Sequence, residues 1–418
     1  MNMHDIEIMS PVGSFESLMA AIQGGAGSVY FGIDKLNMRA KSSINFTATD
    51  LEKIVAICDE HNVKTYLTVN TIMYDDDIQT MKNIIDLAGK HNVNAIIASD
   101  ISAILYARSI GVEVHASTQI NVSNIEALKF YSQYCDVIVL ARELNLDQVR
   151  YISEKIKTEK ITGPSGNLVR LEMFIHGALC MAVSGKCYLS LHEKNYSANR
   201  GQCLQTCRKS YIVTEKESGY ELEIDNEYIM SPKDLKTIHF LNKILDSGVT
   251  VLKIEGRARS PEYVKTVTEC YSQAVKSIFE GSYNKEKIEQ WDKKLSKVFN
   301  RGFWDGYYLG QKLGEWSHQY GSQATKRKIY IAKTTNYFSN IKVGEFIIET
   351  GDIEVGDEII IIGPTTGVVE MQVAEIRVDK KPVNKAIKGQ RFSMPVNQLV
   401  RRSDRLYKLV DSKKIKLQ

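Results

Sequence analysis

The sequence predicts an α/β protein built on a closed barrel of eight parallel strands. Three observations predict this class: short apolar runs that are nearly continuous, helical stretches between them, and eight such strand–helix units within the first 260 residues. Continuous apolar runs are typical of parallel strands that are covered on both faces. A (β/α)8 barrel of the TIM type accommodates all eight units in order, and an open doubly wound sheet is the alternative.

The barrel is assigned to residues 1–260. Strands are expected at 6–11, 28–32, 64–70, 95–100, 112–118, 136–141, 168–175 and 249–256, with helices between them, such as those at 14–25, 49–62 and 124–135. The first helix shows how its ends are encoded. Ser14 can accept a hydrogen bond from a free backbone N–H at the start, and Gly24 and Gly25 can end the helix in a left-handed conformation.

An insertion separates the seventh and eighth strands. It is cysteine-rich, spans residues 180–231, and includes an expected hairpin at 210–231 with its turn near Glu217, Ser218 and Gly219. Loops that follow barrel strands lie on the carboxyl face, where barrel enzymes carry their active sites. We therefore expect the insertion to lie over the active site.

Two further segments follow the barrel. Helices at 261–281 and 285–300 are assigned to a helical extension, residues 261–325, that packs on the barrel. From residue 328 to residue 418, short strands alternate with turn residues and helical periodicity is absent. This pattern predicts a small C-terminal antiparallel β-barrel, which ends in a basic tail.

Composition favours a cytoplasmic protein that does not enter a membrane. The amino terminus lacks the basic and apolar regions of a signal peptide, and no apolar run reaches the roughly 18–20 residues of a membrane helix. The net charge of +4 is too small to establish a nucleic-acid partner. Because cytoplasmic thiols stay reduced, clustered cysteines there favour metal or redox sites over disulfides.

Four of the seven cysteines fall within the insertion, at Cys180, Cys187, Cys203 and Cys207. Their spacing is Cys-x6-Cys-x15-Cys-x3-Cys, whereas structural zinc sites usually have two closely spaced pairs. Iron–sulfur clusters accept irregular spacing, because four thiolates need only converge on one inorganic group. The residues alone leave an iron–sulfur cluster, a zinc ion and four incidental thiols open.

Several motifs resemble those of the collagenase-like U32 peptidase family, and together they extend along essentially the whole chain. They are SPVGSFESLMAAIQGGAGSVYFG (10–32), LARELNLDQV (140–149), LEMFIHGALCMAVSGKCYLS (171–190), NRGQCLQTCR (199–208), LKIEGRARSPEYV (252–264) and FNRGFWDGYYLG (299–310). Within the family, the layout is most similar to the prephenate-dependent tRNA uridine 5-hydroxylation proteins.

The resemblance implies a function, a cofactor and partners. It implies formation of 5-hydroxyuridine at the wobble position of tRNA, with tRNA and prephenate as partners and a second family-member subunit as a further candidate. It also implies an iron–sulfur cluster, of the 4Fe-4S type, held by Cys180, Cys187, Cys203 and Cys207.

Three alternative functions stay open. Other branches of the family act on ribosomal RNA, so hydroxylation of an rRNA cytidine is one, and a non-catalytic RNA-binding scaffold is another. The third is a collagenase-like peptidase. The sequence contains neither the His-Glu-x-x-His motif of zinc peptidases nor the Gly-x-Ser-x-Gly motif of serine hydrolases. Cys180 has His176 four residues away, but a role as cluster ligand explains this thiol better.

The remaining candidate residues are polar side chains expected near the carboxyl ends of strands or beside the cysteines. Catalytic roles are assigned to Asn70, His115, Glu172 and His176, and substrate-binding roles to Arg39, Gln119, Glu255, Arg257, Arg259, Arg208 and Lys209. Guanidinium groups bind carboxylates through two parallel hydrogen bonds, which suits a dicarboxylate such as prephenate. Cations beside the cysteines suit RNA phosphates.

Each of these assignments has a structural alternative. The two histidines could be hydrogen-bonded core residues. Glu172, on a buried strand, could form an ion pair with an arginine or a lysine. Glu255 and Arg257 could form an ion pair that closes the barrel.

Overall fold

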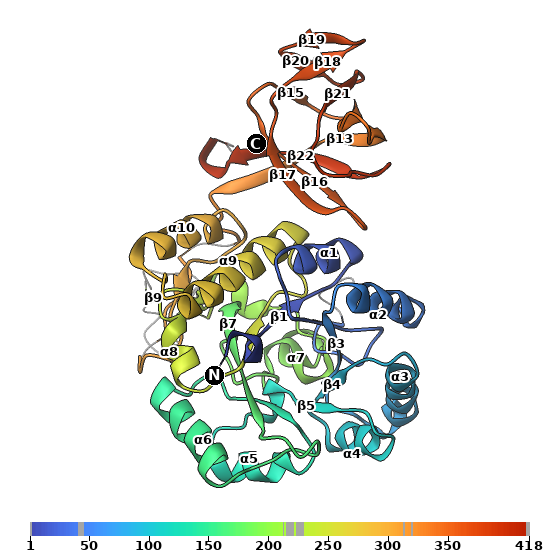
Figure 1. Ribbon diagram of the computed structural model, residues 1–418. Coiled ribbons are helices and arrows are strands. Elements are labelled where there is room, and N and C mark those ends of the chain that lie inside the picture. The colour runs from blue at the N-terminus through green and yellow to red at the C-terminus, as the bar shows by residue number, and fades with distance from the viewer. Residues whose placement is uncertain are drawn as a thin grey trace.

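A closed barrel of eight parallel strands forms the centre of the computed structural model, which describes residues 2–40, 46–211, 213–214, 221–222, 230–311, 314–318 and 321–414 (Figure 1). The strands are β1 (Glu7–Pro11), β2 (Ser28–Phe31), β3 (Lys64–Val69), β4 (Ala95–Ala98), β5 (Val114–Ala116), β6 (Val137–Val139), β7 (Arg170–Gly177) and β11 (Val251–Ile254). Strand β11 pairs in parallel with both β1 and β7, so the sheet closes. The predicted barrel is confirmed, and the open doubly wound sheet is excluded.

Helices surround the barrel and follow its strands in chain order. They are α1 (Phe15–Gln23), α2 (Leu51–Glu60), α3 (Ile78–Lys90), α4 (Ile101–Ser109), α5 (Ile125–Ser132), α6 (Leu146–Thr158), α8 (Leu241–Asp246) and α9 (Pro261–Phe279). The predicted ends of α1 are formed: Ser14 Oγ accepts from the backbone N–H of Ser17 at 3.2 Å, and Gly25 has a φ of +83°.

Helix α9, which was assigned to an extension that packs on the barrel, does pack on it and completes the last β/α unit. It follows the last barrel strand and packs against both α1 and β1. The boundary expected after residue 260 therefore divides one β/α unit, and the barrel continues to Phe279. The next helix, α10 (Lys285–Leu295), packs on α9. Short 3-10 helices are η1 (Met3–Asp5), η2 (Ala48–Asp50), η3 (Asp75–Asp77), η4 (Thr118–Ile120) and η7 (Ser412–Lys414).

The barrel interior is filled in layers. A buried cluster that includes Met9, Tyr30 and Ile97 occupies its centre. At the amino-terminal end, the carboxylate of Glu7 accepts a hydrogen bond from Tyr66 at 2.7 Å and pairs with Arg170 at 3.0 Å. These polar groups fill that end, as expected of a packed barrel core, so the carboxyl end is the place for a site.

The insertion after β7 contains α7 (Leu189–Lys194), η5 (Ala198–Arg200), η6 (Thr206–Arg208), β8 (Val213–Thr214), β9 (Glu221–Leu222) and β10 (Asp234–Lys236). Strands β8 and β9 pair antiparallel, within the expected hairpin, whose turn at Glu217, Ser218 and Gly219 lies outside the described residues. Strand β10 pairs antiparallel with β7, and β12 (Phe303–Trp304) pairs in parallel with β10. Together β10 and β12 extend the barrel wall outward from β7.

An antiparallel β domain follows the barrel, as predicted. Its strands are β13 (Lys326–Phe338), β14 (Val343–Ile348), β15 (Asp352–Glu354), β16 (Glu358–Gly363), β17 (Gly367–Gln372), β18 (Ile376–Val378), β19 (Lys381–Val383), β20 (Lys385–Ile387), β21 (Arg391–Pro395) and β22 (Arg405–Asp411). Eight of them form one sheet in the order β17-β16-β22-β13-β14-β21-β18-β19, and β15 pairs with β20.

The C-terminal domain rests on α1 and α9 (Figure 1). The side chain of Gln23 donates to the carbonyl of Thr366 at 2.9 Å and accepts from the backbone N–H of Val368 at 3.0 Å. Val368 is also buried in the hydrophobic cluster of the barrel. None of the described helices combines the length and the apolar composition needed to span a bilayer.

Candidate active site at the barrel mouth

A pocket lies at the carboxyl end of the barrel, between the strand ends and the insertion. The barrel contributes predicted site residues Arg39, Asn70, Gln119, Glu255 and Arg257, and the insertion contributes Cys180, Cys187 and Cys203. The tertiary structure thus brings the insertion over the barrel mouth, as expected from the position of a loop that follows a barrel strand.

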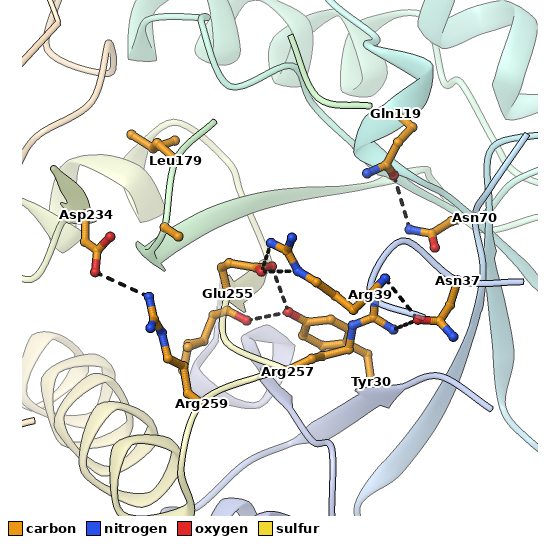
Figure 2. Close-up of polar contacts among 12 residues, drawn as sticks. Tyr30, Asn37, Arg39, Asn70, Gln119, Leu179, Asp234, Glu255, Arg257 and Arg259 are labelled. Atoms are coloured by element: carbon orange, nitrogen blue, oxygen red, sulfur yellow. Dashed lines mark hydrogen bonds and ion pairs between the residues drawn. The ribbon is translucent and has the colours of Figure 1, made fainter. Parts of the chain in front are cut away.

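Glu255 and Arg39 form an ion pair on the wall of this pocket (Figure 2). Arg39 Nη2 donates to Glu255 Oε1 at 2.5 Å, and the Tyr30 hydroxyl lies 3.3 Å from Glu255 Oε2. Burial by itself raises the pKa of Glu255, but the nearby guanidinium groups, chiefly that of Arg39, lower it to about 2. Glu255 therefore pairs with Arg39 rather than with Arg257, and it is ionised at neutral pH.

Arg257 is a buried cation held by neutral groups. Its side chain is 6% exposed, and Nη1 donates to Asn37 Oδ1 at 3.0 Å and to Thr68 Oγ1 at 2.8 Å (Figure 2). Burial lowers the pKa of Arg257 to about 10, so the guanidinium stays charged at neutral pH. Among the described residues, no carboxylate forms an ion pair with it. A buried guanidinium without an anion is costly unless a ligand supplies one.

Arg142 is a second cation of the pocket, half-buried and without an ion-pair partner among the described residues, and it was not predicted from the sequence. It follows β6 and lines the pocket, with its guanidinium 3.7 Å from the centre of the Phe174 ring and Nη1 donating to the carbonyl of Ala178 at 3.0 Å. Its Nε is buried without a hydrogen-bond partner. Its place directly after a barrel strand, in the segment LARE, was the signal that could have identified it.

Glu172 forms a buried ion pair, which was the structural alternative to a catalytic role for this residue. Lys253 Nζ donates to Glu172 Oε1 at 2.6 Å, and both side chains are buried. Lys253 lines the pocket, whereas Glu172 is not among the residues that line it. With Arg39, Arg142 and Arg257, Lys253 makes four cations at the pocket, against the two carboxylates of Glu172 and Glu255. Apart from the thiols, the pocket therefore has an excess of two positive charges.

Asn70 and Gln119 occupy the opposite wall, where Asn70 Nδ2 donates to Gln119 Oε1 at 3.2 Å (Figure 2). Asn70 Oδ1 also accepts from the backbone N–H of Met38 at 3.2 Å. Because Met38 precedes Arg39, this bond fixes the loop that carries the arginine. The geometry assigns Asn70 a positioning role as well as a place in the pocket.

The insertion packs so closely on the barrel at one point that only a glycine fits there. Gly201 has a φ of +76°, and a Cβ at this position would collide with the carbonyl oxygen of Asn37. Asn37 in turn holds Arg257. Arg208 ties the two ends of the insertion together, because it donates to the carbonyls of Leu179 at 2.5 Å and Pro232 at 2.7 Å. The guanidinium group of Arg208, which was predicted to bind substrate, therefore binds backbone carbonyls of this chain.

The four cysteines of the insertion carry free thiols near one another. Cys180 is exposed and the other three are half-buried. Burial raises the pKa of Cys207, Arg208 opposes that shift, and the charges of the other three thiols add to it. No three His, Cys, Asp or Glu side chains in the described part of the chain lie close enough together to hold a single metal ion.

The other predicted site residues lie away from this pocket. His176 is buried against Tyr263, Tyr271 and Phe303, and burial lowers its pKa to about 3, so it is a neutral core residue. A register shift between β7 and β11 explains its position, because the pairing advances from Phe174 directly to His176. This irregularity moves His176 off the inward face that carries Glu172 and Phe174.

His115 points into the barrel but lies deeper than the pocket. Its ring packs 4.5 Å from that of Tyr66, and Nε2 lies 3.2 Å from Glu113. Two candidate cations are engaged elsewhere. Arg259 lies over the Phe299 ring and pairs with Asp234 at 3.9 Å (Figure 2), and exposed Lys209 pairs with Glu193 at 3.0 Å.

Comparison with known proteins identifies relatives along the whole chain. The sequence profile of peptidase family U32 matches residues 13–318. A protein named collagenase from Porphyromonas gingivalis (strain ATCC BAA-308 / W83) is 63% identical over 408 residues, which cover 98% of this chain and 99% of that protein. The tRNA hydroxylation protein P1 of Bacillus subtilis (strain 168) is 30% identical over 414 residues, covering 92% and 95% of the two chains. The 23S rRNA 5-hydroxycytidine synthase of Escherichia coli (strain K12) is 33% identical over 322 residues, covering 75% of this chain and 46% of that protein.

The geometry of Glu255 predicts a pH-dependent contribution to stability. Its pKa is about 2 in the folded protein against an ordinary value of 4.5, so folding gains about 3 kcal/mol from the ionised carboxylate above pH 4.5 and loses it as the pH falls toward 2. We expect Glu255→Gln to lower the free energy of unfolding at pH 7, and the difference from wild type to shrink between pH 5 and pH 3. Urea unfolding at each pH measures it. Glu375→Gln, which removes an exposed ion pair with Arg377, is the control and should change stability little. A difference that stays constant with pH would contradict the assignment.

Proposed function

The chain belongs to peptidase family U32, and from that membership and the chemistry of the pocket we propose that it hydroxylates tRNA, forming 5-hydroxyuridine at the wobble position with prephenate as its small-molecule substrate. The observation that carries the proposal is the excess positive charge at the barrel mouth. Arg142 and Arg257 form no ion pair among the described residues, and both are held in place by neutral contacts. Such groups are ready to bind the two carboxylates of prephenate.

The pocket can also orient a dicarboxylate of this kind. Arg257 lies on the β11 side of the mouth and Arg142 follows β6, so the two cations approach from different strands. The amides of Asn70 and Gln119 line the pocket and can hydrogen bond to the polar groups of the ligand. The ion pair between Arg39 and Glu255 keeps that carboxylate from competing for Arg257.

Prephenate binding should depend on Arg257. Arg257→Gln removes the charge and the forked donor pair, so we expect affinity for prephenate to fall at least tenfold, in line with about 1.5–3 kcal/mol for a hydrogen bond to a charged group. Titration calorimetry measures the change. Arg150→Gln, which removes an exposed cation on α6, is the matched control and should bind as wild type does. Unchanged affinity in Arg257→Gln would remove the pocket from the proposal.

The four thiols of the insertion are proposed to hold an iron–sulfur cluster of the 4Fe-4S type. Three of them line the pocket, and the fourth, Cys207, is near enough for their charges to raise its pKa. Four thiolates suit iron–sulfur clusters and zinc alike. Their irregular spacing in the sequence, Cys-x6-Cys-x15-Cys-x3-Cys, supports the cluster, because four thiolates need only converge on one inorganic group. When bound, the cluster would supply redox or Lewis-acid chemistry at the pocket wall.

Anaerobic purification tests this assignment. We expect a brown protein with about four iron and four sulfide per chain. Cys180→Ser and Cys207→Ser should each lower the iron content, whereas Cys58→Ala, which alters a buried thiol of α2, should not. A colourless protein that contains one zinc per chain would contradict the cluster.

The RNA class is proposed from the extent of the similarity. This chain covers 95% of the Bacillus subtilis tRNA hydroxylation protein but 46% of the Escherichia coli rRNA enzyme. A tRNA substrate and reduced thiols would place the protein in the cytoplasm. The similarity to a protein named collagenase favours peptidase activity as the second candidate. Weighing against it, no histidine is among the described residues that line the pocket, and a cysteine peptidase uses a histidine as its base.

Nucleoside analysis distinguishes these functions. In a strain that lacks the gene, we expect 5-hydroxyuridine and its derivatives to disappear from digested tRNA, as measured by mass spectrometry. Wild-type protein should restore them and Arg257→Gln should not. Unchanged tRNA with loss of 5-hydroxycytidine from rRNA would support the rRNA alternative. Gelatin cleavage by the purified wild type, with unchanged nucleosides, would support the peptidase.

A further inference from the structure

A second groove adjoins the pocket described above. Arg142, Cys180, Val183 and Ser184 line both cavities and so form the wall between them. The groove is also lined by three aromatic residues from the segment that follows α10, namely Trp304, Tyr307 and Trp316. The proposed chemistry of the first pocket uses none of these aromatic side chains.

The aromatic side is preassembled. The rings of Trp304 and Tyr307 meet edge to face with centroids 5.2 Å apart. Gly314 lies next to both Tyr307 and Trp316, since a Cβ at this position would be 3.5 Å from the Trp316 ring and 3.6 Å from the Tyr307 hydroxyl. Strand β12 carries Trp304 and is fixed to the barrel through β10. The rings therefore belong to the scaffold.

The opposite side is apolar and open. Met181 and Val183, both from the insertion, are 45% and 43% exposed. Exposed apolar side chains and fixed aromatic rings that line the same groove favour a flat, unsaturated ligand, because such a ligand can contact both kinds of surface.

Two buried donors at this groove have no partner. Trp304 is 5% exposed, and its indole Nε1 has no hydrogen-bond acceptor in the described structure. Arg142, on the shared wall, also has a buried Nε without a hydrogen-bond acceptor in the described structure. An indole N–H can only donate, so its natural complement is a carbonyl oxygen. Unpaired buried donors are rare in folded proteins and point to a ligand that supplies the acceptor.

We propose that this groove binds the target pyrimidine base of an RNA, unstacked from its neighbours. The inference rests on the proposed function and specifies where the base enters. A pyrimidine ring stacks on the aromatic side, and one of its carbonyl oxygens accepts from Trp304 Nε1. Because Arg142 and Cys180 belong to both cavities, a base in the groove lies against the pocket proposed for prephenate. Enzymes that modify a base generally extrude it into a pocket of this kind.

Two synthetic tRNA anticodon hairpins test the inference. One has uridine at the wobble position and the other has an abasic nucleotide there. Phosphate contacts are the same in both, so their difference in affinity reports the base alone. We expect wild type to bind the uridine hairpin about tenfold more tightly, as stacking of one base predicts. Fluorescence anisotropy measures both affinities.

Three tryptophan variants locate the effect. Trp316→Leu should abolish the preference for the uridine hairpin, and Trp304→Phe, which keeps a ring but removes the N–H, should reduce it. Trp291→Phe is the matched control, because Trp291 lies on α10, donates to Gln273, and lines neither cavity. Equal wild-type affinities for the two hairpins, or a full preference in both groove variants, would overturn the inference.

Prephenate calorimetry on the same preparations separates this inference from the proposed function. Protein that binds prephenate but does not prefer the uridine hairpin refutes the base groove alone. Protein that prefers the uridine hairpin through Trp304 and Trp316 but does not bind prephenate supports the groove and refutes the prephenate-dependent function.

Discussion

Positive charge removed from water at the mouth of the barrel governs how the whole site is arranged. Four buried or half-buried cations surround one pocket, and removing such charges from water is costly unless they are balanced. Two are balanced internally, Arg39 by Glu255 and Lys253 by Glu172. Arg142 and Arg257 are not, and neutral amides, hydroxyls and an aromatic ring hold them in position. A fold that maintains such groups is prepared for an anionic ligand.

The closed barrel is what makes this arrangement rigid. Each pocket cation follows or belongs to a barrel strand, and the layers beneath them are packed with aromatic and apolar side chains. The internal ion pairs have a second effect, because they neutralise the carboxylates that would otherwise bind the free arginines. Asn37 and Asn70 complete the arrangement: one holds Arg257, and the other holds the loop that precedes Arg39.

The insertion turns an open barrel mouth into two neighbouring cavities. Its cysteines line the charged pocket, and its apolar residues line the groove that contains Trp304, Tyr307 and Trp316. A single segment therefore forms part of the wall of both cavities. The close approach of Gly201 to Asn37 and the clamp formed by Arg208 hold the segment in place. This layout suits a reaction between a small polar substrate and a flat base, since each would have its own compartment beside the same thiols.

Sequence patterns were enough to predict the eight strands, the helices between them, the position of the cysteine-rich insertion and the antiparallel nature of the last domain. These features depend on local periodicity and on the rule that active sites lie at the carboxyl ends of barrel strands. Sequence patterns could not predict which charged side chains of the pocket lack an ion-pair partner among the described residues. Glu172 is neutralised by Lys253, which lies 81 positions away in the chain, and a register shift in β7 removes His176 from the inward face. Ion-pair partners and strand register are set by contacts between segments that are distant in the sequence, so local sequence patterns do not predict them. The helix after residue 260 was predicted to pack on the barrel as an extension, and its contacts with α1 and β1 make it the helix of the last β/α unit.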